Sequence, residues 1–177
     1  MTCIVATTQG GLITMGADSA AVSGFDMTIR KDPKIFRNGD MLIGYTSSFR
    51  MGQLLGFKLQ IPKRHQDIDL FRYMATEFVD AVRECLRVGG YTAINSNRED
   101  GGEFLVGTEG RLFRVYSDFQ VEEAATGFNA CGCGQAYALG AMAASAEPTA
   151  RGRVLSALAI AEQFNAGVRG PFSVETL

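Results

Sequence analysis

Three polar residues at equal intervals along the chain, Thr2, Asp18 and Lys34, are the first candidates for chemistry. Thr2 stands directly behind the initiator methionine. If Met1 is removed, Thr2 carries a free α-amine and a hydroxyl on one residue, which is a nucleophile with its own base. A small residue at position two normally permits removal of the methionine, so we expect this processing.

Asp18 and Lys34 are the residue types that would support such a nucleophile. A free α-amine has a pKa of about 7.7–8.0, close enough to neutral to act as a base. A nearby ammonium group lowers the pKa of both the amine and the hydroxyl, and a carboxylate would hold that ammonium charged and oriented. Taken singly, each of the three residues is equally typical of a structural or solvated position.

The elements around these residues predict how they would be brought together. Residues 3–8 and 12–18 have the composition of two strands, and Gln9-Gly10-Gly11 is typical of a hairpin turn. Such a hairpin places Asp18 beside the start of the chain. Lys34 opens a further strand over 34–37, which an Asn-Gly-Asp turn connects to a buried strand over 41–45.

The rest of the chain alternates between groups of strands and groups of helices. Ser48 is a suitable N-cap for a helix that runs to Leu59, and Asp69 opens a longer helix that ends at Gly89. Thr149 caps a last helix. Further strands are predicted over 27–30, 103–108, 111–116, 124–128 and 172–174, a small-residue helix after a glycine-rich turn within 130–143, and loops over 20–24 and 95–102.

This order predicts an α+β fold rather than alternating βαβ units, because strands and helices are segregated along the sequence. Two antiparallel sheets stacked face to face, with a helix pair on each outer side, would bury the observed pattern. The length of 177 residues is sufficient for one domain and short for two, so we assign residues 1–177 to a single domain.

Composition and charge exclude several classes of function. The net charge of −2 gives no basic field for nucleic acid or an anionic membrane. The sequence has no apolar run of membrane-spanning length and no signal-peptide pattern, so we expect a cytoplasmic protein. Its four cysteines and single histidine, His65, do not form a zinc pattern, and we expect no metal and no cofactor.

Several segments together resemble a known family. They are Thr2 with Ile4-Val5, the run from Met15 to Ser19, Arg30 to Ile35, Leu42 to Tyr45, Gly132 to Ala138, and the ending Phe172 to Leu177. With the equal spacing of Thr2, Asp18 and Lys34, the chain resembles HslV-type peptidase subunits and proteasome β subunits, which are N-terminal-nucleophile hydrolases. The resemblance covers nearly the whole chain and indicates a divergent HslV-like branch or a bacterial or phage proteasome homologue.

The resemblance implies a four-layer αββα sandwich that assembles into stacked rings around a closed chamber. Thr2 would attack a peptide carbonyl with the help of Asp18 and Lys34, and the acyl-enzyme would then be hydrolysed. The N–H of Ser47 would stabilise the oxyanion. Thr46 and Tyr45 would border the pocket for the substrate side chain.

The sequence departs from the family at several of these positions. Cys133 stands where a serine normally orients the terminal amine, and a thiol is a weaker hydrogen-bonding group. Ser47 occupies a position that is often glycine. Gln163 and Ala166 stand near the places where proteasome subunits carry an aspartate and a serine.

Three functions are therefore compatible with the sequence. The first is a self-compartmentalising threonine endopeptidase that degrades unfolded polypeptide, formed from like subunits and served by an AAA+ ATPase unfoldase. The second is a ring-forming scaffold with weak or no activity. The third is an amidohydrolase of the same mechanism that acts on small amides.

Overall fold

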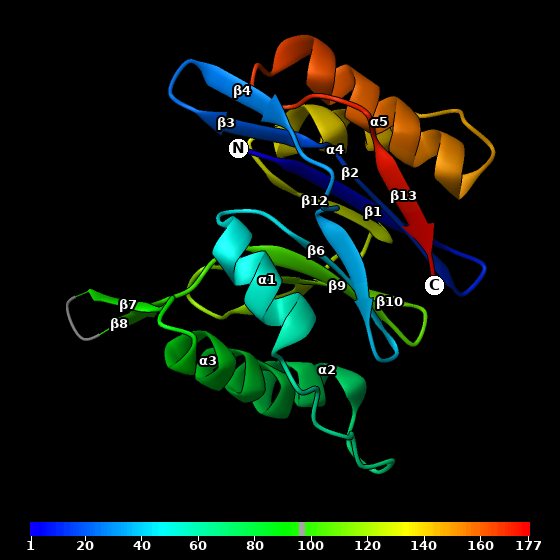
Figure 1. Ribbon diagram of the computed structural model, residues 1–177. Helices are drawn as coiled ribbons and strands as arrows, with labels where there is room; N and C mark the ends of the chain where they lie inside the picture. The colour runs from blue at the N-terminus through cyan, green and yellow to red at the C-terminus, as the bar shows by residue number, and fades with distance from the viewer. Residues whose placement is uncertain (96–97) are drawn as a thin grey trace.

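Two antiparallel sheets stack at the centre of the molecule, and helices cover the outer face of each sheet (Figure 1). The computed structural model describes residues 1–95 and 98–177. The first sheet contains, in order, β12 (Phe128–Gly132), β1 (Cys3–Gln9), β2 (Leu12–Ala17) and β13 (Ser173–Thr176). The second contains β11 (Val121–Glu123), β10 (Arg111–Val115), β9 (Phe104–Thr108), β6 (Met41–Tyr45) and β5 (Ile35–Asn38). The predicted α+β class and layered arrangement are confirmed.

The hairpin of β1 and β2 places the start of the chain inside the first sheet. Gly10 and Gly11 form its turn with positive φ angles of 60° and 80°, a conformation that glycine adopts without steric strain. The register pairs Ile4 with Ala17, so the residue after Ala17 lies beside the residues that precede Ile4. Asp18 is therefore brought next to Thr2 and Cys3 by the length of the hairpin alone.

The helices pack in two groups. The helix α1 (Phe49–Phe57) begins at Ser48, whose hydroxyl accepts a hydrogen bond from the Arg50 N–H, as predicted. The second helix consists of α2 (Leu70–Tyr73), a π-helical turn (Met74–Phe78) and α3 (Val79–Val88). These segments cover the second sheet, whereas α4 (Gln135–Ala144) and α5 (Ala150–Phe164) cover the first (Figure 1).

Three apolar layers follow from this stacking. Residues such as Phe78 and Phe113 fill the space between α1–α3 and the second sheet, and Met142 and Leu158 pack between α4, α5 and the first sheet. Between the sheets lie Ile4, Ala6, Ile13, Met15, Ala17, Ile35, Leu42, Leu105, Leu112 and Cys131. Strand β1 alternates between two of these layers, because successive side chains point to opposite faces.

Two predicted loops are wrong, because short strands pair with each other outside the main sheets. The segment 20–24 contains β3 (Ala20–Ser23), which pairs with β4 (Asp26–Ile29) in a separate hairpin. Within the predicted loop 95–102, β8 (Arg98–Asp100) pairs with β7 (Ala93–Asn95). Residues 96 and 97 of that prediction lie outside the described residues.

The predicted strand over 124–128 is also wrong. Residues 124–127 form the turn between β11 and β12, and the strand begins at Phe128. Strand β12 pairs with the first five residues of β1, from Cys3 with Gly132 to Thr7 with Phe128. Small residues form a strand here because their backbone continues the sheet, a tertiary effect that overrides local propensity.

None of the helices in the described ranges is both long and apolar enough to cross a membrane.

Candidate active site

Thr2 lies at the end of β1, enclosed by the turn that leads from β12 to α4. Only 5% of Thr2 is exposed, whereas Met1 is 52% exposed. The Thr2 N–H donates to Sγ of Cys133 at 3.3 Å, and the thiol is within 3.3 Å of the Thr2 carbonyl oxygen. The Thr2 hydroxyl donates to the Met1 carbonyl oxygen at 2.6 Å. The Cys133 side chain thus contacts both the N–H and the carbonyl oxygen of Thr2.

Asp18 and Lys34 form a buried ion pair beside the start of β1. Lys34 Nζ is 2.8 Å from Asp18 Oδ1, and the two side chains are 1% and 0% exposed. The same oxygen accepts a hydrogen bond from the Cys3 N–H at 2.9 Å. The other carboxylate oxygen accepts from the N–H groups of Ala20 at 3.0 Å and Arg169 at 3.4 Å. Asp18 therefore connects the lysine to the backbone immediately after Thr2.

Burial sets the electrostatics of Lys34. Removal from water lowers the pKa of its ammonium group below the usual value, and the attraction of Asp18 only partly opposes this effect. The thiols of Cys133 and Cys3 are close enough to contribute as well. Burial and the charge of Asp18 raise the pKa of the Cys3 thiol, so this cysteine stays protonated and packs as an apolar side chain.

Gly132 makes the close approach of β12 to Thr2 possible. Its φ of 94° is strained for any residue with a side chain. A Cβ atom here would lie 2.3 Å from the Thr2 carbonyl oxygen and 3.0 Å from Thr46 Oγ1. The backbone of Gly132 is therefore in direct contact with the candidate nucleophile and with the end of β6.

We expect Gly132→Ala to lower the free energy of unfolding by more than about 2 kcal/mol, because it adds both backbone strain and a clash. Gly140→Ala is the matched control. Gly140 lies in α4, and a Cβ there would meet no atom within 4 Å. Alanine at this helix position should stabilise the protein by about 0.5–1 kcal/mol. Chemical denaturation measures both changes, and equal stability of the two variants would contradict the role of Gly132.

The residues predicted to bind substrate are the last residue of β6 and the two residues that follow it. Tyr45 is buried, which raises the pKa of its phenol to about 12, and its ring contacts those of Phe36 and Phe49. Thr46 is 7% exposed, and its side chain reaches toward Gly132. The structure thus brings Thr46 to the Thr2 turn, whereas the ring of Tyr45 packs in the aromatic cluster.

Ser47 is exposed and has a φ of 65°, in the left-handed region that non-glycine residues rarely adopt. Its hydroxyl accepts a hydrogen bond from the Glu103 N–H at 3.0 Å, which holds this conformation. Within residues 1–95 and 98–177, no group accepts a hydrogen bond from the Ser47 N–H. An N–H without an acceptor, on an exposed residue held in a strained conformation, is suited to bind an anion.

One residue that contacts the site, at the end of α5, was not predicted from the sequence. Asn165, the C-cap of α5, donates from Nδ2 to the Cys133 carbonyl oxygen at 2.8 Å and accepts from the Gly167 N–H at 2.9 Å. Gln163 and Ala166, which were singled out instead, are exposed. An asparagine just after a helix is common for local reasons, so its sequence position gave little signal.

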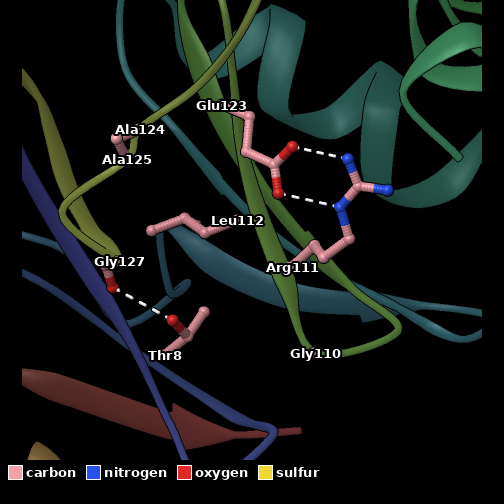
Figure 2. Close-up of a pocket in the computed structure, with 8 residues that line it drawn as sticks. All are labelled: Thr8, Gly110, Arg111, Leu112, Glu123, Ala124, Ala125 and Gly127. Carbon is pink, nitrogen blue, oxygen red and sulfur yellow. Dashed lines mark hydrogen bonds and ion pairs between the residues drawn. The ribbon is translucent and has the colours of Figure 1, made fainter.

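A separate hollow of about 310 Å³ lies at the other end of β1, beside Thr8. Arg111 and Glu123 form a bidentate ion pair along its rim, as Figure 2 shows. Because each strand residue advances about 3.3 Å, Thr8 is about 20 Å from Thr2 along β1. This hollow is not part of the Thr2 cluster, and neither is the exposed His65.

The two stacked sheets with a helix layer on each outer side define a proteasome-like fold. Solved structures confirm this fold. A Thiobacillus denitrificans BPH structure in complex with epoxomicin matches with a TM-score of 0.82 and 22% identity, covering 99% of this chain and 98% of that one. HslV from Trypanosoma brucei matches with a TM-score of 0.70 and 18% identity, covering 99% of each chain.

A third similar structure is an Anbu (Gly-1) mutant from Hyphomicrobium sp. strain MC1, with a TM-score of 0.70 and 19% identity. The match covers 98% of this chain and 80% of the Anbu chain. No protein-family model and no curated protein matches the sequence. The predicted resemblance to HslV and the proteasome is thus confirmed in three dimensions.

Proposed function

We propose that this protein is the threonine-type peptidase subunit of a ring-shaped protease, with Thr2 as its nucleophile after removal of Met1. The observation that carries this proposal is the set of contacts at the start of β1: Cys133 contacts the Thr2 N–H, and the buried pair of Asp18 and Lys34 contacts the next N–H, that of Cys3. Each polar group around Thr2 matches one need of an N-terminal nucleophile. The amine needs an orienting partner, and the hydroxyl needs a nearby positive charge.

The reaction would proceed in two halves. The Thr2 amine, directly or through a water molecule, accepts the hydroxyl proton while Oγ1 bonds to the carbonyl carbon of the substrate. Collapse of the tetrahedral intermediate breaks the C–N bond and returns the proton to the leaving amine. Water then attacks the resulting ester, with the same amine as the base, and releases the second product together with free Thr2.

Two fixed groups would stabilise the charges that develop. The Ser47 N–H, which has no acceptor among the described residues, would donate to the oxyanion of each tetrahedral intermediate. Lys34 would place a positive charge beside the start of β1, and Asp18 holds that charge in place through a 2.8 Å contact. Thr46 would border the substrate side chain, and Tyr45 would support the wall behind it.

Cys133 gives a direct test of how the terminal amine is oriented. We expect Cys133→Ser to raise the rate of hydrolysis by about fivefold, because a hydroxyl forms a better hydrogen bond than a thiol, with a difference of about 1 kcal/mol. Cys133→Ala should lower the rate instead. The measurement is kcat for a fluorogenic peptide with each variant. Equal rates for the serine and alanine variants would show that residue 133 does not hold the amine.

One contact favours the alternative of an inactive ring-forming scaffold. While Met1 is present, its carbonyl oxygen accepts a hydrogen bond from the Thr2 hydroxyl, and a Cβ placed on Gly167 would lie 2.7 Å from Met1 Sδ. Met1 thus packs against the turn and blocks both the amine and the hydroxyl. A mature protein that retained Met1 would be a scaffold.

Intact mass and covalent labelling together test the proposed function. We expect the mass to correspond to a chain without Met1, and epoxomicin to label Thr2, since a protein of the same fold binds this compound. Failure to label in a chain that has lost Met1 would contradict the peptidase assignment.

The assembly and its surroundings form the second part of the proposal. We infer a ring of like subunits that acts in the cytoplasm on unfolded polypeptide delivered by an AAA+ ATPase. The shared fold with HslV supports the ring. Native mass spectrometry of the purified protein tests it, and a monomer that hydrolyses small amides would favour the amidohydrolase alternative.

A further inference from the structure

Arg114 on β10 is a buried arginine that spans the space between the two sheets. Its side chain is 9% exposed. Phe113 and Val115 belong to the layer against the helices, whereas Leu112 belongs to the layer between the sheets. Because strand residues alternate, Arg114 shares the face of Leu112 and points toward the first sheet. An arginine in this layer is unexpected, since its neighbours there are apolar.

The guanidinium group has partners on three different segments. Nη1 donates to the Ala130 carbonyl oxygen at 3.2 Å. Nη2 donates to the Glu103 carboxylate at 2.9 Å and to the side-chain oxygen of Gln135 at 2.9 Å. The Tyr116 ring lies 4.3 Å from Cζ and fixes the plane of the group. Only arginine offers a rigid fork that can serve several acceptors in this way.

Glu103 connects Arg114 to the segment that carries the Ser47 N–H. The Glu103 N–H donates to the Ser47 hydroxyl at 3.0 Å, and its carbonyl accepts from the Thr46 N–H at 3.1 Å. Both backbone groups of Glu103 therefore hold residues 46 and 47, including the left-handed conformation of Ser47. The contact between the Glu103 carboxylate and Arg114 holds Glu103 itself in place.

Ala130 and Gln135 connect Arg114 to the turn that carries Cys133. Ala130 lies on β12, and Gln135 is the first residue of α4, so the two contacts bracket the turn 132–134. Within this turn, Cys133 contacts the Thr2 N–H, and the Gly134 N–H points to the Thr2 carbonyl oxygen at 3.4 Å. Arg114 thus holds the frame that positions the amine of Thr2.

We propose that Arg114 is a positioning residue that fixes the Ser47 N–H and the Thr2 amine relative to each other. The inference rests on the proposed function, because it assigns roles to both groups in the same reaction. The burial of a guanidinium is expensive, and an apolar residue of similar size would often be as stable or more stable. A role in geometry rather than in stability explains why the charge lies here.

The test compares Arg114→Met, Arg114→Lys and Glu103→Gln with Arg111→Met as the matched control. Arg111 is on the same strand, but its ion pair with Glu123 lies at the hollow beside Thr8, at the other end of β1 (Figure 2). We expect Arg114→Met to lower kcat for a fluorogenic peptide by about 100-fold with little change in KM, because misplacement of reacting groups by about 1 Å has this effect. Arg114→Lys should recover part of kcat, and Arg111→Met should match the wild type.

Amide hydrogen exchange on the same variants provides a readout that does not depend on activity. We expect faster exchange in Arg114→Met both at residues 46–48 and at residues 132–135, and no change there in Arg111→Met. If Arg114→Met fails to fold, Glu103→Gln decides. This change weakens only the connection to residues 46 and 47, and it should lower kcat and loosen that segment alone.

The outcomes separate this inference from the proposed function. A wild-type protein that neither hydrolyses peptide nor reacts with epoxomicin refutes the proposed function, and exchange alone then decides whether Arg114 couples the two segments. In an active protein, an Arg114→Met variant with the kcat of Arg111→Met overturns the inference. In Arg114→Met, exchange that changes in only one of the two segments, or a rise in KM without a fall in kcat, overturns it as well.

Discussion

Thr2→Ala is expected to reduce peptide hydrolysis by at least about 10⁴-fold while the protein folds and assembles as before. The substitution removes the attacking oxygen, and no other hydroxyl can take its place on the same residue as the α-amine. It should not disturb the fold, because the Thr2 hydroxyl donates only to the Met1 carbonyl in the described structure. The Thr2 backbone contacts with Cys133 and Gly134 remain available to alanine.

Two control variants make this result specific. Thr8→Ala removes a hydroxyl from the same strand, where it contacts the Gly127 carbonyl oxygen far from Thr2, and should keep wild-type activity. Thr2→Ser retains a hydroxyl beside the amine and should keep measurable activity. The measurements are kcat and the mass of the assembly. Hydrolysis by Thr2→Ala at the wild-type rate would refute the assignment of Thr2 as nucleophile.

The part of the site that depends on local structure could be predicted from the sequence. The turn at Gly10-Gly11 fixes the length of the first hairpin, and hairpin pairing then places Asp18 beside Cys3. Lys34 reaches Asp18 because it directly precedes β5, which pairs with β6 in the second sheet. Equal spacing was informative because each interval contains one hairpin, β1–β2 in the first and β3–β4 in the second.

The residues that frame the site could not be predicted, because their partners are distant in sequence. Arg114 and Glu103 contact the site through the stacking of the two sheets, which no periodic pattern encodes. Asn165 meets Cys133 only because α4 and α5 pack on the same face of the first sheet. Local patterns specify the elements, whereas the contacts between layers appear only when the elements are packed.

The assignment of β12 shows the same limit. Ala130, Cys131 and Gly132 have no strong β propensity, and their sequence indicated a turn before a helix. They form a strand because they pair with Cys3–Thr7 on the edge of β1 that β2 leaves open. This pairing also places Cys133 beside Thr2. The position of this candidate site residue therefore depends on a strand that the local sequence does not predict.

Lys34→Met is expected to lower the free energy of unfolding by about 3–5 kcal/mol, because it leaves the Asp18 carboxylate buried without its counter-charge. The same change should reduce kcat by about 10²–10³-fold, the effect of removing one fixed charge or donor from a preorganised site. Asp18→Asn should also reduce stability. It leaves the buried Lys34 ammonium group without its counter-charge, and it places an amide NH₂ near the N–H groups of Cys3 or Ala20.

The double variant Asp18→Asn/Lys34→Met separates the structural role of the pair from its chemical role. With both charges removed, the loss of stability should be smaller than the sum of the two single losses, because neither charge is left unpaired. Activity should remain as low as in Lys34→Met, since the positive charge near the Thr2 hydroxyl is still absent. Chemical denaturation and kcat for a fluorogenic peptide measure the two quantities independently. Recovery of activity together with stability would mean that the pair only supports the fold, and that Thr2 reacts without help from a buried ammonium.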